Sequence, residues 1–295
     1  MTLETLLAVC VGGVVLGALY ALMATGLAVV WTTLGVFNFA HGAFIAVGAY
    51  VAWQVAAIEP GHAGLLAGAI AAIVCLFALG ALFHRLLVKP FERKASLVLL
   101  SVATTLAGAA ILEGTTNLVW GPRPKQIAPI IPGNIDWAGV ALSRNELAMI
   151  IISVVILMAV GLFLSRSSVG RSMRAVAQNR EAAQLLGLDV GRLYAIAFGL
   201  SAALAGVAGL FIGSIRFMSP TMGAEPLMKA LIVVIFGGVA RFTSPILAAF
   251  VVGLMEAFAT YYVGLYWAPA VLFALMIAVL VVKPEGLFGR HERSV

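Results

Sequence analysis

The feature that most constrains this chain is a run of about 20 uncharged, mostly apolar residues that recurs along nearly its whole length. A helix that crosses the hydrocarbon core of a bilayer needs a run of this length. Because the runs are continuous and do not alternate with polar residues, they favour helices over a membrane barrel. Only 10% of the 295 residues are charged, and the polar segments are too short to bury a core. We therefore predict an all-α polytopic membrane bundle that forms a single domain over residues 1–295.

Polar breaks divide the chain into apolar segments, from which we predict about eight membrane spans. The first segment follows no basic stretch, so we interpret it as a retained span and not as a cleaved signal. The short segment 227–240 is a candidate broken or re-entrant piece. The segments cover residues 5–31, 42–58, 64–88, 96–120, 146–165, 193–214, 227–240, 245–264 and 267–282.

Two of the breaks, 84–94 and 166–192, carry an excess of basic residues. Their basic residues are Arg85, Lys89, Arg93 and Lys94 in the first break and Arg166, Arg171, Arg174, Arg180 and Arg192 in the second. Since Lys and Arg are enriched in cytoplasmic loops, both breaks are predicted to be cytoplasmic. The break 121–144 then lies outside, and it is too rich in proline for a helix, so we expect an ordered external loop. This topology accounts for the net charge of +6 without a nucleic-acid partner.

The break 166–192 is longer than a connection between two membrane helices requires, and long loops often carry function. Ser167 or Ser168 is a candidate N-cap for one helix from about residue 170 to residue 186, and Gly187 is its candidate stop. The helix has both apolar and basic positions, which is typical of a helix on the membrane surface. It binds either anionic lipid headgroups or a cytoplasmic partner, since both need such faces.

Motifs along the chain carry a family resemblance. EAAQLLG at residues 181–187 fits the E-A-A-x-x-x-G signature with which ABC importer permeases contact their ATPase subunit. NFAHG at 38–42, GRSMRAVAQ at 170–178 and VVKPEGLFG at 281–289 follow the order of one group of these permeases. Over essentially its full length, the sequence resembles the shorter, H-type permease of branched-chain amino acid ABC importers.

The resemblance implies a multi-pass protein of the bacterial inner membrane that translocates branched-chain or related amino acids. It implies three kinds of partner, namely a second related permease subunit, two ABC ATPase subunits and a periplasmic substrate-binding protein. It places the contact with the ATPase on Arg171, Arg174, Gln178, Arg180, Glu181, Ala182, Ala183 and Gly187.

Two departures from the family pattern leave the solute open. Ala43 stands where related permeases tend to carry a glutamate, and FGGVARFTSPI places Arg241 and Phe242 in a turn of small residues. The wider family also carries urea, short amides and small carboxylates, which are therefore alternative solutes.

Energy for transport has to come from other subunits. The sequence has no G-x-x-x-x-G-K-[ST] motif, so we expect no cofactor on this chain and ATP bound by the partner ATPases. It has no nucleophile–base constellation either, so we predict a transport permease with no catalytic residue and no metal site, not an enzyme. A stand-alone secondary transporter or channel is the alternative of another class, but it leaves the 166–192 loop unexplained.

The stretch GVFNFAHGAF at residues 35–44 places two polar side chains, Asn38 and His41, inside an apolar region. In a bilayer, irregular backbone survives only inside protein or along a water-filled cavity. Gly35 and Gly42 bracket the stretch, which indicates a broken helix of the kind found in transporters. The two side chains either satisfy loose helix ends or line the translocation route. The candidate translocation residues are Asn38, His41, Gly42 and Glu113.

Four more charges need an interpretation. Glu113 and Glu256 lie within predicted spans, where a charge is costly and is functional by default. Each is alternatively interfacial or paired with a neighbouring chain. Lys229 at a span end is a candidate for snorkelling. Arg216 lies outside in this topology, as a solvated loop charge or as a contact for a binding protein or a carboxylate.

Two further sequence patterns concern a candidate internal repeat and helix packing. A shift of 203 residues superimposes three residues ahead of a helix in each half, as in the repeats of transporters. The superimposed pairs are Gly35 with Gly238, Val36 with Val239 and Phe39 with Phe242. Small residues also follow one side of the segment 193–214, where they predict close helix packing. They include Gly199, Gly206 and Gly209.

Overall fold

The computed structural model describes residues 2–59, 61–92, 96–137, 140–238, 244–284 and 286–288. The chain forms two compact units. Unit 1 comprises residues 1–25, 129–157 and 228–295, and unit 2 comprises residues 26–128 and 158–227. The single domain predicted over residues 1–295 stays a prediction.

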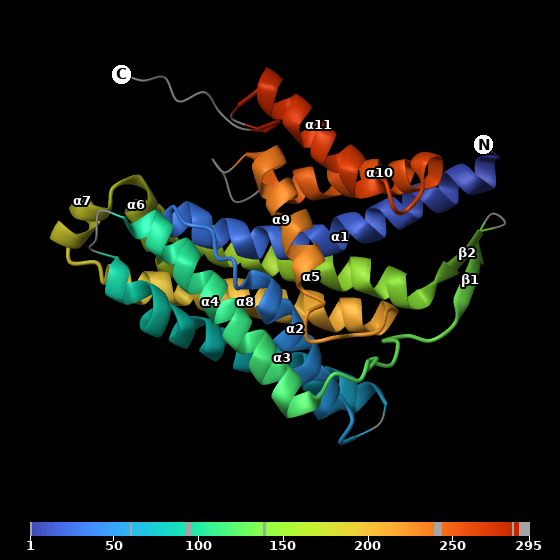
Figure 1. The fold of residues 1–295 in the computed structure, drawn as a ribbon, viewed down its shortest axis with the longest axis horizontal. Helices are drawn as coiled ribbons and strands as arrows, with labels where there is room; N and C mark the ends of the chain where they lie inside the picture. Colours follow the sequence, from blue (N-terminus) through green and yellow to red (C-terminus); the bar gives the residue numbers. More distant parts are fainter. Residues whose placement is uncertain are drawn as a thin grey trace. The chain divides into compact units, whose positions relative to one another are not determined.

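Over the described ranges the regular secondary structure is helical except for one short hairpin and one isolated bridge (Figure 1). A π-helical turn, His84–Val88, and a 3₁₀ turn, Lys89–Phe91, follow the third helix. The helices are α1 (Leu3–Leu34), α2 (His41–Ala56), α3 (His62–Phe83), α4 (Leu97–Trp120), α5 (Arg144–Arg166), α6 (Ser168–Gln178), α7 (Arg180–Leu185), α8 (Val190–Ile215), α9 (Ala224–Gly237), α10 (Ser244–Val263) and α11 (Ala268–Val282).

Among the described residues, six helices are long and apolar enough to cross a membrane, namely α1, α3, α4, α5, α8 and α10. Two shorter apolar helices, α2 and α11, bring the set to the predicted number of about eight. The prediction of an all-α polytopic membrane bundle is confirmed. α9 spans 14 residues, which agrees with its interpretation as a short piece.

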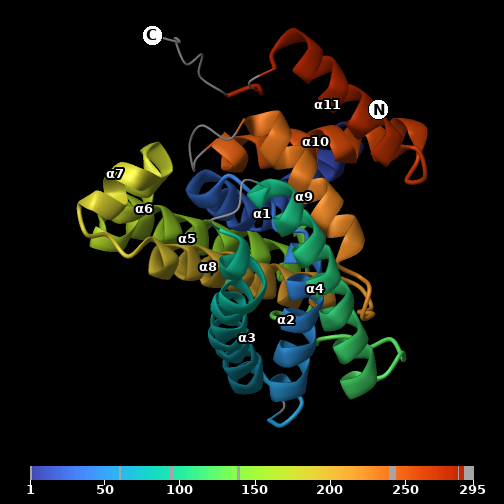
Figure 2. The same cartoon turned by 60° about the vertical axis from the view of Figure 1, so that its left-hand side comes forward.

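The core of unit 2 is α8, which is buried along nearly its whole length and packs against α2 and α3. Figure 2 shows α2, α3 and α4 running side by side. Small residues allow this packing: a Cβ on Gly199 would lie 2.8 Å from the carbonyl oxygen of Phe77, and a Cβ on Gly48 would strike Gly206. The predicted close packing along this side of α8 is confirmed.

In unit 1, the first part of α1 packs closely on α10. A Cβ on Gly17 would lie 2.8 Å from the Cα of Phe250, and a Cβ on Gly253 would lie 2.5 Å from the amide nitrogen of Gly17. Helices in a membrane associate through such small-residue contacts, because lipid offers no hydrophobic drive between them. The contact brings the residues that follow, Tyr20 and Glu256, within hydrogen-bonding reach of each other.

The predicted external loop contains a regular element that the sequence did not indicate. Strand β1 (Asn134–Trp137) pairs antiparallel with β2 (Val140–Ser143). Next to the hairpin, Asn145 at the start of α5 accepts a hydrogen bond from the amide of Ile130 at 2.8 Å through its side-chain oxygen. Proline prevents a helix in this loop but permits the ordered connection found here.

The predicted repeat has a structural counterpart. Gly35 follows α1 with a φ of 73°, and Gly238 follows α9 with a φ of 78°. Positive φ is the common way to end a helix, and glycine adopts it without a Cβ penalty. Val239 and Phe242, the other members of the second half, lie outside the described residues.

Candidate functional site

The NFAHG segment forms the predicted break between α1 and α2 in unit 2. Asn38 is fully buried, and its Oδ1 accepts a hydrogen bond from the amide of Ala40 at 3.1 Å. The amide of Phe39 donates to Thr105 Oγ1 on α4 at 3.3 Å. These bonds satisfy amide groups that the break releases from the helical ladder. Within the described ranges, the Nδ2 of Asn38 has no hydrogen-bond partner.

His41 begins α2 and is fully buried between helices of the same unit. Its Nδ1 lies 3.2 Å from Ser201 Oγ on α8, and a Cβ on Gly26 would lie 2.9 Å from its ring carbon Cε1. Next to it, a Cβ on Gly42 would lie 2.5 Å from the carbonyl oxygen of Gly223. The break is therefore a tightly packed polar site inside unit 2.

Glu113, the fourth candidate translocation residue, is not part of this cluster. It lies half-buried on α4, and its carboxylate has no hydrogen-bond or ion-pair partner among the residues that the structure describes. The structure thus brings Asn38, His41 and Gly42 together and leaves Glu113 apart from them.

The segment predicted to be cytoplasmic forms two helices and not the single helix that we predicted over residues 170–186. Ser167 caps α6, since its Oγ accepts from the amide of Gly170 at 2.9 Å. At Asn179 the backbone is extended, and its Oδ1 accepts from the amide of Ala182 at 2.9 Å, which starts α7. Asparagine is a strong N-cap, so a new helix begins where the first one ends. Gly187, with a φ of 82°, ends α7 as predicted.

Two of the candidate coupling residues bind the chain's own backbone. Arg171 donates to the carbonyl oxygen of Arg166 at 2.8 Å, and Arg174 donates to the carbonyl oxygens of Leu164 and Ser165. Those are among the last carbonyls of α5, which have no partner within their own helix. Both arginines therefore hold α6 against the end of α5, and an arginine is favourable there because of the helix dipole.

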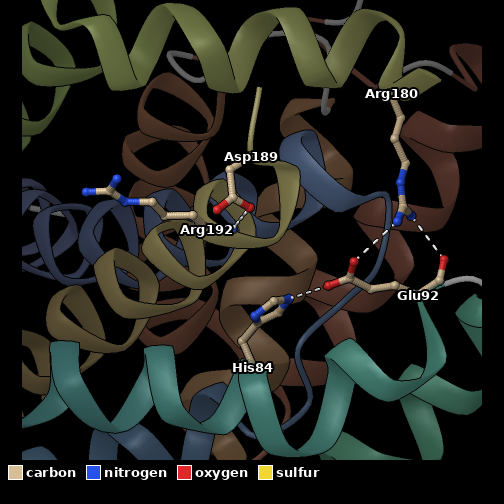
Figure 3. Close-up of polar contacts among 5 residues, drawn as sticks. All are labelled: His84, Glu92, Arg180, Asp189 and Arg192. Atoms are coloured by element: carbon tan, nitrogen blue, oxygen red, sulfur yellow. Dashed lines mark hydrogen bonds and ion pairs between the residues drawn. The ribbon is translucent and has the colours of Figure 1, made fainter. Parts of the chain in front are cut away.

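Arg180, the first residue of α7, enters a buried polar network (Figure 3). Its guanidinium donates to the carbonyl oxygen of Glu92 at 3.0 Å and to Glu92 Oε2 at 3.2 Å. The other carboxylate oxygen of Glu92 lies 2.9 Å from His84 Nε2. The guanidinium also lies 5.5 Å from the centre of the Tyr194 ring on α8. Sequence reasoning missed Glu92 and His84, because their partner Arg180 is distant along the chain.

The far end of α7 is a projecting apolar tip. Leu185 is 89% exposed and Leu186 is 82% exposed, although leucine side chains are usually buried. Glu181, Ala182 and the nearby Gln178 are exposed too, whereas Ala183 is buried against the protein. We call Leu185 and Leu186 the leucine tip. The pair is a surface suited to an apolar groove on a partner.

Unit 1 holds a charged site that sequence reasoning left unassigned. Glu256 on α10 accepts hydrogen bonds from Tyr20 Oη on α1 at 2.5 Å and from Lys229 Nζ on α9 at 2.6 Å. Glu256 therefore pairs within this chain, and Lys229 does not snorkel to an interface, contrary to two of the alternatives considered above. The sequence did hold a signal for this pair: Lys229 and Glu256 are opposite charges in apolar segments, and charges inside a membrane usually pair with each other.

The remaining predicted charges are at the surface or lie outside the described residues. Arg216 lies 3.8 Å from Glu225, and both side chains are more than half exposed, which fits a solvated loop charge. Arg93, Lys94, Arg241 and Phe242 lie outside the described residues.

Comparison with known proteins identifies the family. A family model described as "Branched-chain amino acid transport system / permease component" matches residues 9–280. The chain belongs to this family of ABC transporter permeases. The "High-affinity branched-chain amino acid transport system permease protein LivH" of Escherichia coli is 30% identical over 292 residues, which cover 95% of this chain and 94% of that relative.

Two further relatives have similar lengths and similar identities. The corresponding permease protein BraD of Pseudomonas aeruginosa is 28% identical over 294 residues, covering 96% of this chain and 95% of its own. A "Probable branched-chain amino acid transport permease protein LivH" of Methanocaldococcus jannaschii is 29% identical over 296 residues, covering 94% and 91%. The resemblance to branched-chain amino acid permeases is confirmed over the whole membrane domain.

Proposed function

We propose that this chain is the inner-membrane permease of an importer that moves branched-chain or related amino acids into the cell. The observation that carries the proposal is the leucine tip, which ends a basic segment on the side predicted to be cytoplasmic. A groove on an ATPase subunit would cover these two side chains. Family membership and the names of the relatives support the solute class.

The proposed mechanism needs three kinds of partner. A periplasmic binding protein delivers the solute outside, and a second related permease subunit completes the pore. Two ATPase subunits bind ATP and hold α7 from the cytoplasm. Their closure moves α7, and the membrane helices switch from outward to inward access as rigid bodies.

Within the proposed route, His41 is the residue we assign to the path, and Asn38 is mainly structural. The Oδ1 of Asn38 already serves the backbone of Ala40, whereas an imidazole can both donate and accept. We expect Asn38→Leu to reduce the amount of assembled complex, and His41→Ala to leave assembly intact and to lower the initial uptake rate. Glu113 is proposed to face the second permease or the route, since a half-buried carboxylate in a span is costly without a partner.

The test of the proposal is reconstitution with the products of the neighbouring genes. Proteoliposomes should take up labelled leucine, isoleucine or valine only with ATP and the binding protein, and urea or short amides more slowly. Leu185→Glu with Leu186→Glu should lose ATPase co-purification and uptake. Leu287→Ala, at an exposed leucine in the C-terminal tail, is the control. Normal uptake in the double variant would remove the docking role from α7.

Orientation is tested separately by labelling. In a background without Cys10 and Cys75, a cysteine at Gln178 should react only after the membrane is opened. A cysteine at Asn134 in the hairpin should react in intact spheroplasts. Both positions are exposed on the protein, so a reversed pattern would overturn the topology and the cytoplasmic docking segment with it.

A further inference from the structure

Arg180 fastens α7 to the membrane helices of unit 2. It donates from Nη1 to the carbonyl oxygen of Glu92 at 3.0 Å and from Nη2 to the carboxylate at 3.2 Å. A guanidinium that binds at two points fixes direction as well as distance, which a lysine cannot do. Arg180 therefore links α7 to both the backbone and the side chain of Glu92.

Glu92 passes the contact on through its second carboxylate oxygen, which lies 2.9 Å from His84 Nε2. His84 is fully buried where α3 ends. Its ring packs against two aromatic rings of α8, with centroids 6.1 Å from Tyr194 and 5.3 Å from Phe198. In Figure 3 the carboxylate of Glu92 lies between the guanidinium and the imidazole. One side chain thus bridges α7 to the end of α3 and the first turns of α8.

The local backbone at this bridge is irregular. His84 begins the π-helical turn that runs to Val88, and the 3₁₀ turn Lys89–Phe91 follows directly before Glu92. Such departures from the α-helix occur frequently at functional sites and hinges. The described part of the connection after α3, residues 84–92, therefore consists of two non-α turns followed by Glu92.

We infer that Glu92 is a positioning residue that transmits the movement of α7 to α3 and α8. The inference rests on the proposed docking of an ATPase on α7, and it names the residue that connects that docking to the membrane helices. A purely structural Glu92 would differ in one measurable way. Its replacement would lower the amount of assembled complex and leave the solute transported per ATP hydrolysed unchanged.

The test uses Glu92→Gln in the complete importer. Glutamine keeps the shape of the side chain, so the complex should still assemble. It removes the negative charge that holds the Arg180 guanidinium, which weakens the link between Glu92 and α7. We expect assembly close to wild type, continued ATP hydrolysis and a roughly tenfold fall in solute transported per ATP hydrolysed. Both rates are measured in proteoliposomes and normalised to assembled complex.

Asp189→Asn is the matched control. Asp189 is an acidic residue near the same end of α8, and its Oδ1 accepts from the amide of Arg192 at 3.0 Å (Figure 3). Among the described residues its carboxylate accepts no hydrogen bond from α7. This variant should transport as much solute per ATP as the wild type. Arg180→Gln should match Glu92→Gln, and the double variant should be no worse than either, because the two residues act in series.

Three results would overturn the inference: a wild-type transport ratio in Glu92→Gln, a loss of assembly at an unchanged ratio, or additive losses in the double variant. The variant with glutamate at positions 185 and 186 separates this failure from failure of the proposed function. If that variant keeps its ATPase and its uptake, the docking itself is wrong, whatever Glu92 does. If that variant loses its ATPase and its uptake while Glu92→Gln transports normally, the docking proposal stands and only the role of Glu92 is wrong.

Discussion

Two ion-pair networks described above differ in how far their side chains are exposed. In unit 1, Lys229 and Glu256 are 2.6 Å apart, with side chains 12% and 4% exposed. In unit 2, Arg180 and Glu92 are 3.2 Å apart, and the arginine is 29% exposed. Two charges that are both buried depend on each other, because water cannot replace either partner. A partly hydrated charge can be separated at lower cost. The Lys229–Glu256 pair is therefore suited to holding its helices in place, and the Arg180–Glu92 pair to a connection that moves.

The largest effect should come from breaking the buried pair on one side. Lys229→Met leaves the Glu256 carboxylate buried without its cation, which should destabilise the protein by about 3–5 kcal/mol. The yield of folded permease after detergent extraction, measured by size-exclusion chromatography, should fall sharply. Lys229→Met together with Glu256→Gln removes both charges and should recover most of the yield. Equal losses of yield in the single and double variants would contradict the stabilising role of the Lys229–Glu256 pair.

A smaller effect should follow from removing the hydroxyl that supports this pair. Tyr20→Phe keeps the ring on α1 and deletes the 2.5 Å hydrogen bond to Glu256. Hydrogen bonds to charged groups contribute roughly 1.5–3 kcal/mol, and thermal unfolding in detergent should report a loss in that range. An unchanged unfolding temperature would show that the lysine alone balances the carboxylate.

A change at the start of α7, next to the Arg180–Glu92 pair, should have only a local effect. Asn179→Ala removes the side-chain acceptor for the amide of Ala182, which should cost about 1 kcal/mol. Hydrogen exchange should accelerate in peptides that cover α7 and stay unchanged in those from α8. Asn179→Asp retains the cap and is the control. Faster exchange throughout unit 2 would mean that α7 unfolds together with the membrane helices.

The smallest effect belongs to a pair that is open to water on both sides. Arg216→Ala removes the 3.8 Å contact with Glu225, where both side chains are more than half exposed. Such pairs contribute about 0–1 kcal/mol, so the unfolding temperature should hardly change. A loss as large as that of Tyr20→Phe would break the relation between burial and stabilisation on which the comparison rests.

The sequence predicted what depends on neighbours along the chain. Apolar runs placed the membrane helices within a few residues. Ser167 and Gly187 correctly bounded the helical part of the 166–192 break, because caps and stops are local signals. The break at Asn179 was missed, although asparagine is a strong N-cap, because the residues on either side are good helix formers.

Contacts between distant segments could not be predicted. Glu256 binds Tyr20 from 236 positions away, and Arg180 binds Glu92 from 88 positions away. Both pairings depend on which helix faces pack together, and hydropathy does not report this. For the same reason, the bonds of Arg171 and Arg174 to the last carbonyls of α5 were not foreseen. Their predicted contact with a partner stays a prediction.

The leucine tip has a consequence for how the cell makes this protein. In the predicted topology, a permease that is inserted before its proposed ATPase partner is present displays two adjacent exposed leucines to the cytoplasm. Exposed apolar side chains of this kind attract chaperones and proteases and promote aggregation. We therefore expect free permease to be short-lived and ATPase supply to set its abundance. Expression of the chain alone should give little intact protein, and co-expression should raise the yield before any transport is measured.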